Sequence, residues 1–215
     1  MMRAGLFTLG GALLAAIWLG PLPELARRSF AAHMAMHMGV VAIAAPLLAG
    51  AFAAPWPGRV RWSVGAQAAV AASLIEMTVV WGWHAPALHH AARQHTWALA
   101  LEQGSFLIAG VALWVAVLGG TRDQQRRSAG AGVAALLFTS MHMTLLGALF
   151  ALSNRPLFQH APADAAALAD QHLGGAIMLL VGGASYLFGG LWLTARMLHP
   201  ASRTRFGNAG WAGGS

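Results

Sequence analysis

The sequence predicts an all-α fold, a polytopic membrane protein built as a bundle of six transmembrane helices. Hydrophobic residues make up 58% of the 215 residues and charged residues only 9%, whereas soluble domains carry roughly 25% charged residues. Six apolar stretches reach or approach the roughly 20 residues that cross a bilayer as a helix. They are 4–23, 29–58, 62–92 (interrupted only by Glu76), 103–121, 128–154 and 171–195. Little chain remains for a soluble domain.

The helices are expected, in chain order, at about 4–22, 30–54, 62–84, 97–119, 129–152 and 171–196. Pro21-Leu22-Pro23 ends the first, Pro55-Trp56-Pro57-Gly58 connects the second to the third, and Gly119-Gly120 closes the fourth. Residues 1–198 thus form a single transmembrane domain. The Gly-, Ala- and Ser-rich residues 199–215 are expected to be a flexible cytoplasmic tail.

Arginine counts predict the orientation, since all thirteen basic residues are arginines. One side of the predicted bundle holds nine: Arg3, Arg59, Arg61, Arg122, Arg126, Arg127, Arg196, Arg203 and Arg205. The other side holds four: Arg27, Arg28, Arg93 and Arg155. The positive-inside rule places the richer side, and with it both termini, in the cytoplasm. The net charge of +7 therefore indicates topology and not nucleic-acid binding.

The second helix opens with His33-Met34-Ala35-Met36-His37-Met38, in a chain without cysteine. His33 and His37 are four residues apart and share a helix face, while Met34 and Met38 form a second pair rotated by about 100°. Imidazole and thioether ligands favour a soft metal, above all Cu(I). The alternative is a helix end at the interface with methionines packing as ordinary core. We expect a metal site, because ionisable groups inside spans are usually functional.

Other histidines fall on the same predicted outer side. His142, between Met141 and Met143, can supply a ligand from the fifth helix with one of those methionines, although a buried histidine satisfied by Ser or Thr is the alternative. His84 ends the third helix and can reach the same site. His89, His90 and His95 are expected to be solvent-exposed loop residues that help to capture metal.

Two further residues lie within predicted spans. Glu76 is costly in lipid unless it faces the bundle interior. It is expected either to orient a ligating imidazole or to be a protonated structural carboxyl. Pro46 removes one helix hydrogen bond and predicts a kink below the His and Met face.

Several separate motifs occur in an order that is typical of one family. They are His33-Met34-x-x-His37-Met38 with Ala45-Pro46-Leu47-Leu48, Trp83-His84-x-Pro86-x-Leu88, Glu102 with Phe106, Met141-His142-Met143-Thr144-x-x-Gly147, Arg155-Pro156-Leu157-Phe158, and Asp170-Gln171-x-Leu173-Gly174-Gly175 with Met178. Over roughly residues 10–198, the chain resembles the multi-span CtaG family of cytochrome c oxidase assembly factors, the branch associated with caa-type oxidases. Gln103, His172 and His89 depart from the family pattern, which has His, Gln and Tyr at these places.

The resemblance implies a non-enzymatic protein of the bacterial cytoplasmic membrane that delivers copper to a haem-copper oxidase, or matures its metal centres, by ligand exchange. The implied partners are an oxidase subunit within the bilayer and a copper donor protein at the outer face. The expected Cu(I) ligands are His33, His37 and His142, with Met34, Met38, Met141 or Met143 completing a soft shell and His84 and His172 as auxiliaries. Glu76, Glu102 and Asp170 are expected to orient these ligands.

Three other functions remain open from the sequence. Histidines on three spans could be axial ligands of a haem-binding cytochrome. Intramembrane His and Glu also form relays in proton or metal transporters, although the inner half of this chain is nearly empty of ionisable residues. A scaffold without metal is the third.

Overall fold

The computed structural model describes residues 2–53, 65–120, 122–158 and 165–198, and within these ranges every regular element is helical. The elements are α1 (Met2–Leu19), α2 (Leu22–Arg28), α3 (Phe30–Met38), the π-helical segment η1 (Gly39–Ala44), α4 (Ala45–Ala53), α5 (Ala66–Trp83), α6 (Pro86–Gln94), α7 (Thr96–Leu118), α8 (Arg122–Ala151), α9 (Ala165–Ile177), the π-helical segment η2 (Met178–Gly182) and α10 (Gly183–Leu198). The predicted all-α fold is confirmed for this part of the chain.

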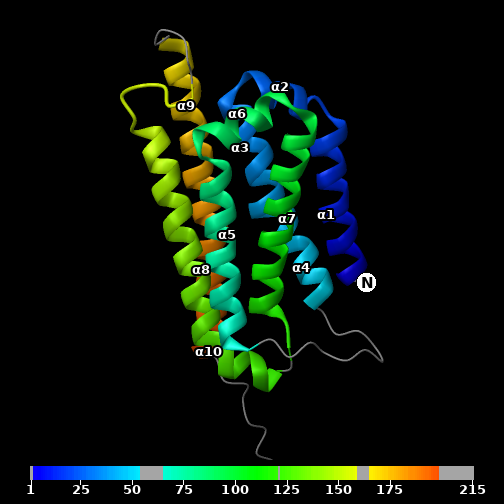
Figure 1. The fold of residues 1–215 in the computed structure, drawn as a ribbon. Coiled ribbons are helices and arrows are strands. Elements are labelled where there is room, and N and C mark those ends of the chain that lie inside the picture. Colours follow the sequence, from blue (N-terminus) through cyan, green and yellow to red (C-terminus); the bar gives the residue numbers. More distant parts are fainter. Residues whose placement is uncertain (1, 54–64, 121, 159–164, 199–215) are drawn as a thin grey trace, which may run out of the picture.

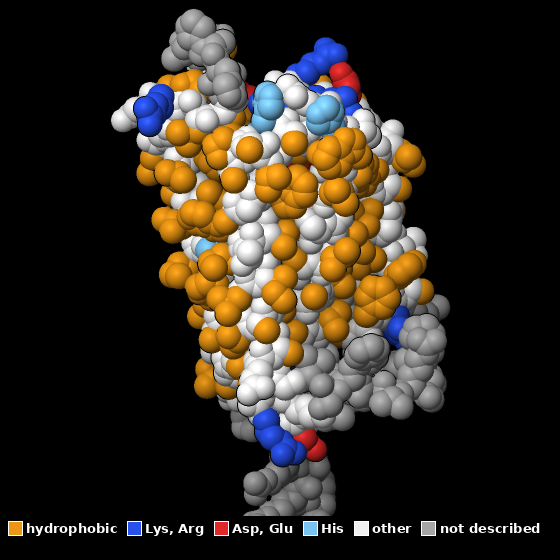
Figure 2. Space-filling model, in the orientation of Figure 1, with side chains coloured by type: hydrophobic (Ala, Val, Ile, Leu, Met, Phe, Trp, Pro, Cys, Tyr) orange, Lys and Arg blue, Asp and Glu red, His pale blue; other side chains and the backbone are white. Residues whose placement is uncertain are grey.

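Five helical segments are long and apolar enough to cross a membrane, as expected of a multi-pass membrane protein. They are Met2–Leu19, Phe30–Ala53, Thr96–Leu118, Asp123–Ala151 and Ala165–Leu198. On the face drawn in Figure 2, hydrophobic side chains cover the middle of the molecule, and most of the charged side chains gather at its two ends. α5 has the same length as α1 but is less apolar, because it carries Gln67 and Glu76.

The long helices run side by side, and the short helices α2 and α6 lie across one end of the bundle (Figure 1). We call this the α2–α6 end. α5 packs against α7 and α8, and α8 packs against α10. α1 lies against η1 and α4, and it buries only Gly10 and Ile17. The core therefore lies among α3, α5, α7, α8 and α10, where buried polar side chains can face one another.

The segment η1 lies where the sequence predicted a disturbance of the second span. Pro46 has no N–H, so it cannot donate to the carbonyls of Val41 and Ala42 on the preceding turn. Side chains of α10 satisfy both carbonyls: Tyr186 donates to Val41 O at 3.3 Å, and Ser185 donates to Ala42 O at 2.7 Å. These two hydroxyls join the final helix to the helix that carries His33 and His37.

α8 and α9 cross in close contact because glycines lie at the crossing. A Cβ atom at Gly147 would lie 2.7 Å from the backbone nitrogen of Leu179, and one at Gly175 would lie 2.7 Å from the carbonyl oxygen of Gly147. Backbone meets backbone here, as is common where small residues let membrane helices approach.

Several predicted boundaries differ from the observed ones. The segments 21–29 and 85–96, which were predicted to be outer connections, contain the helices α2 and α6. Each helix has a proline in its first turn, a position that favours helix initiation. The last span begins at Ala165 instead of residue 171, and the fifth helix begins at Arg122, before residue 129. The predicted tail 199–215 and the predicted connection at 55–58 lie outside the described residues.

Candidate metal centre

Four buried histidines converge below the α2–α6 end. His33 and His37 come from α3, His84 follows the last residue of α5, and His89 comes from α6. Each side chain is 6% exposed or less. The ring centroids of His33 and His89 lie 4.8 Å apart, and those of His37 and His84 lie 5.5 Å apart. His84 links the two pairs, with its ring 6.4 Å from that of His89.

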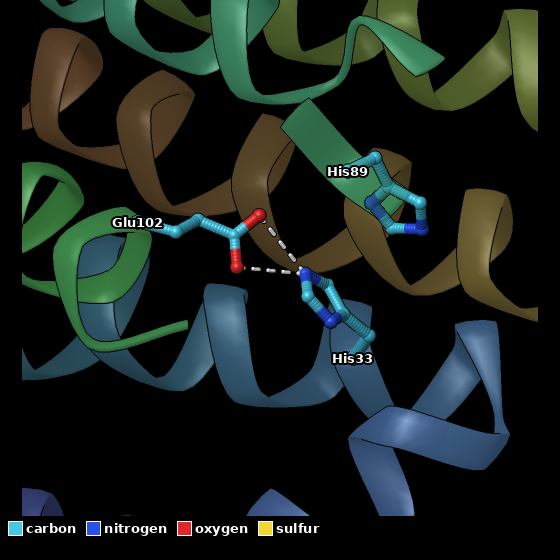
Figure 3. Close-up of side chains that lie close together, drawn as sticks. All are labelled: His33, His89 and Glu102. Carbon is cyan, nitrogen blue, oxygen red and sulfur yellow. Dashed lines mark hydrogen bonds and ion pairs between the residues drawn. The ribbon is translucent and has the colours of Figure 1, made fainter. Parts of the chain in front are cut away.

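Glu102 of α7 brings a carboxylate to this group. Its Oε2 and Oε1 atoms lie 3.0 and 3.1 Å from Nε2 of His33. The side chains of His33, His89 and Glu102 each offer one ligand atom, and these atoms lie within 4.8 Å of one another. Figure 3 shows the carboxylate and the His89 ring on two sides of the His33 ring. We call the four histidines and Glu102 the histidine cluster.

Hydrogen bonds fix which ring nitrogens carry lone pairs. Nδ1 of His84 lies 2.7 Å from the carbonyl oxygen of Val80, which can only accept, so Nδ1 carries the proton. The lone pair of His84 is therefore on Nε2. An ionised Glu102 can only accept, so with Glu102 in that state Nε2 of His33 donates to it and the lone pair of His33 is on Nδ1. Metal-binding histidines typically donate a hydrogen bond through one ring nitrogen, which leaves the lone pair of the other nitrogen free for the metal.

Within the described residues, several buried nitrogens of the cluster have no hydrogen-bond partner. They are Nδ1 of His33, both ring nitrogens of His37, Nε2 of His84 and both ring nitrogens of His89. A buried polar atom left unsatisfied costs about 1–3 kcal/mol. A metal ion bound by several of these nitrogens would remove this cost, so the donor set fits a metal that imidazole ligands prefer, such as copper or zinc.

Aromatic rings enclose the cluster. Phe106 lies 3.9 Å from His37 between ring centroids, Phe158 lies 4.2 Å from His89, and Phe150 lies 5.6 Å from His84. Burial, together with the nearby His33 and His84, lowers the pKa of His89 well below the usual value for histidine. His89 is therefore neutral at neutral pH, which is the protonation state that binds metals.

Polar contacts at the α2–α6 end hold the helices that carry the histidines. Ser29 caps α3 by accepting from Ala32 N at 3.1 Å. Asp170 of α9 accepts from Ser29 Oγ at 2.7 Å and from Phe30 N at 2.6 Å. The guanidinium of Arg93, on α6, donates to the carbonyl of Arg27 at 3.1 and 3.2 Å. Asp170 thus anchors the first turn of α3, one turn before His33.

The methionines predicted as ligands lie apart from this cluster. Met34 and Met38 are buried and face α9 and η2, where they approach Gly174 and Gly182. Met143 is buried beside Gly182 as well, whereas Met141 is 61% exposed and points out of the bundle.

Two histidines that were predicted as metal ligands, His142 and His172, contact residues outside the histidine cluster. His142 of α8 is 3% exposed and lies beside Phe138, and among the described residues no ring contact joins it to the cluster. Nε2 of His172 forms a hydrogen bond of 2.8 Å with the carbonyl oxygen of Ser153.

Of the acidic residues that were predicted to orient metal ligands, Glu102 belongs to the histidine cluster and Glu76 does not. Glu102 contacts His33, and Gln103 donates to Glu102 at 3.2 Å. Glu76 instead accepts from Tyr186 of α10, far from the cluster along α5.

The prediction that His89 is solvent-exposed was wrong. Residues 86–94 form an amphipathic helix, which buries His89 and Ala92 and leaves His90 exposed. The sequence signal for this short helix was Pro86 followed by apolar residues at helical spacing. Glu102 was expected only to orient a ligand, yet its carboxylate lies at the distance of a ligand itself.

The sequence model of a protein family described as cytochrome c oxidase caa3 assembly factor (Caa3_CtaG) matches residues 1–199. No curated protein and no solved structure shows a match to this chain.

Proposed function

This chain belongs to the family of cytochrome c oxidase caa3 assembly factors, and on that premise we propose that it binds copper as Cu(I) in the histidine cluster and passes it to the oxidase. The family is one of assembly factors and not a class of catalytic enzymes. The single observation that carries the copper proposal is the convergence of four buried histidines and one glutamate from four helices. Within this group, His33, His89 and Glu102 bring their ligand atoms within 4.8 Å of one another.

Charge balance favours Cu(I) over a divalent ion. Neutral imidazoles add no charge, and an ionised Glu102 adds one negative charge within a buried site. A monovalent cation then gives a neutral complex, whereas a divalent ion leaves one uncompensated charge, which is costly away from water. Transfer to the oxidase needs only ligand exchange, in which a ligand from the partner replaces one imidazole.

The proposal includes the topology. We infer that α5 is the sixth span, because it is as long as α1 and packs between α7 and α8. Its Glu76 faces the interior, where Tyr186 donates to it. Both termini are in the cytoplasm, and the α2–α6 end faces outward from the bacterial cytoplasmic membrane. An outer-face donor protein can then supply the copper, and the oxidase subunit receives it.

Copper content and affinity of the purified full-length protein test this proposal. Wild-type protein should retain Cu(I) against a Cu(I)-specific chelator. His33→Ala and His37→Ala each remove one imidazole and should lower the affinity by about tenfold or more. His95→Ala is the matched control, because His95 is exposed and stacks on Trp97 outside the cluster.

Three results would contradict the proposal. Unaltered copper retention by both cluster variants would exclude the cluster as the site. Zinc that co-purifies, without binding of Cu(I), would show that the metal is misassigned. A Soret band in the purified protein would favour a haem-binding cytochrome.

A further inference from the structure

The methionines of α3 form a second group of potential ligands on a different face of the same helix. Met34 and Met38 each follow a cluster histidine by one residue, so their side chains point about 100° away from those of His33 and His37. Both methionines are fully buried or nearly so. The helix therefore presents imidazoles to α5, α6 and α7, and thioethers to α9 and η2.

Contacts with glycines show which parts of the chain these methionine side chains approach. The Sδ atom of Met38 is 3.0 Å from the place that a Cβ atom would take at Gly182, and the Cβ and Cγ atoms of Met143 are 3.6 and 3.8 Å from the same place. Met38 and Met143 thus meet over one glycine, although they come from α3 and α8. Similarly, Cγ of Met34 is 3.1 Å from the corresponding place at Gly174.

Met178 completes this group from a third helix. It lies four residues after Gly174 and four before Gly182, so it shares the face of that helix which approaches Met34 and Met38. It is also fully buried. Met34 lies about two helical turns away, at Gly174, so the group is confined to three methionines from α3, α8 and η2. We call them the methionine cluster: Met38, Met143 and Met178.

We propose that the methionine cluster is a second copper site, specific for Cu(I), to which the histidine cluster passes its ion across α3. Thioether sulfur selects Cu(I) and is a poor ligand for Zn²⁺, whereas imidazole accepts copper and zinc alike. The pair of sites therefore selects Cu(I) twice: the histidine cluster favours a monovalent ion by its charge, and the methionine cluster excludes zinc by its thioether ligands. This proposal deepens the proposed copper function and rests on it.

Selenomethionine-labelled full-length protein tests the second site directly. The labelled protein is loaded with Cu(I), and X-ray absorption at the selenium edge measures whether copper is bonded to selenium. The wild type should show a copper–selenium contribution. Met38→Leu combined with Met143→Leu should abolish it and should lower the amount of bound copper, because two of the soft ligands are removed. His37→Ala should keep the copper–selenium contribution, because it leaves the methionine cluster intact.

Met36→Leu is the matched control, because Met36 is equally buried on α3 but points roughly opposite to Met34 and Met38. It should bind copper like the wild type. Met178→Leu, which changes one side chain of similar volume, is the second variant if the double variant fails to fold.

The outcomes separate the two proposals. Copper bound without any copper–selenium contribution would overturn the methionine site and leave the proposed function standing. A wild type that binds no copper would overturn both. A copper–selenium contribution that is unchanged in the folded double variant, or in Met178→Leu if the double variant fails to fold, would show that the sulfur ligands are elsewhere.

Discussion

At the scale of single residues, the two neighbouring histidines of α6 distinguish the site from the surface. His89 is 1% exposed and faces His33, whereas His90 is exposed. His89→Ala should lower the copper affinity by about tenfold or more, because it removes one ligand of a small set. His90→Ala should leave the affinity unchanged. Competition with a Cu(I)-specific chelator measures both, and equal affinities in the two variants would contradict the placement of His89.

The buried state of His89 also predicts a pH dependence in metal-free protein. Its pKa is lowered in the folded state, so the unfolded chain binds a proton more readily once the pH falls below about 6.5. The stabilising contribution of neutral His89 is thus present above that pH and is lost on acidification, by at most about 1.4 kcal/mol per pH unit. The unfolding temperature should fall between about pH 7.5 and 5.5, and it should fall less in His89→Gln. An equal fall in both proteins would refute this.

Only part of the site could be predicted from the sequence. His33 and His37 share a helix face by their spacing alone, and His84 was placed near them by its position at the end of a span. His89 and Glu102 come from other helices, and no spacing rule joins residues across elements. The Met residues were predicted in one shell with the imidazoles, but the rotation of consecutive residues around α3 directs them to a different neighbour.

At the scale of the elements, the crossing of α8 and α9 depends on the absence of side chains. Gly147→Ala places a Cβ atom against the backbone of Leu179, which cannot move as a flexible side chain would. We expect destabilisation of about 1–3 kcal/mol, which is typical of overpacking. Gly104→Ala is the control: a Cβ atom at Gly104, in α7, meets nothing within 4 Å. Thermal unfolding in detergent compares the two, and a Gly147→Ala variant as stable as Gly104→Ala would contradict the close crossing.

The spans were predictable as elements, whereas their local irregularities were not. Long runs without charge define a span through hydrophobicity alone. α2 and α6 are short and lie at one end of the bundle, so composition does not reveal them. Pro46 signalled a disturbance, but the hydroxyls of Ser185 and Tyr186 that satisfy the freed carbonyls come from more than 140 residues away. Only the folded arrangement brings them together.

At the scale of the whole molecule, the asymmetric distribution of arginine predicts the orientation. Nine arginines on one side against four on the other predict that both termini lie in the cytoplasm. Reporter fusions at residue 90 and after residue 215 should therefore give opposite signals, with residue 90 outside. Identical or reversed signals would contradict the orientation and would move the histidine cluster to the wrong face for an outer copper donor.

We propose that the histidine cluster supplies the oxidase with copper. The copper content of cytochrome c oxidase isolated from cells that carry His37→Ala tests it most directly, with His95→Ala as the control. In His37→Ala cells, the oxidase should retain haem but be deficient in copper, whereas in His95→Ala cells it should be fully loaded. A fully copper-loaded oxidase from cells whose membranes contain His37→Ala at the normal level would contradict it.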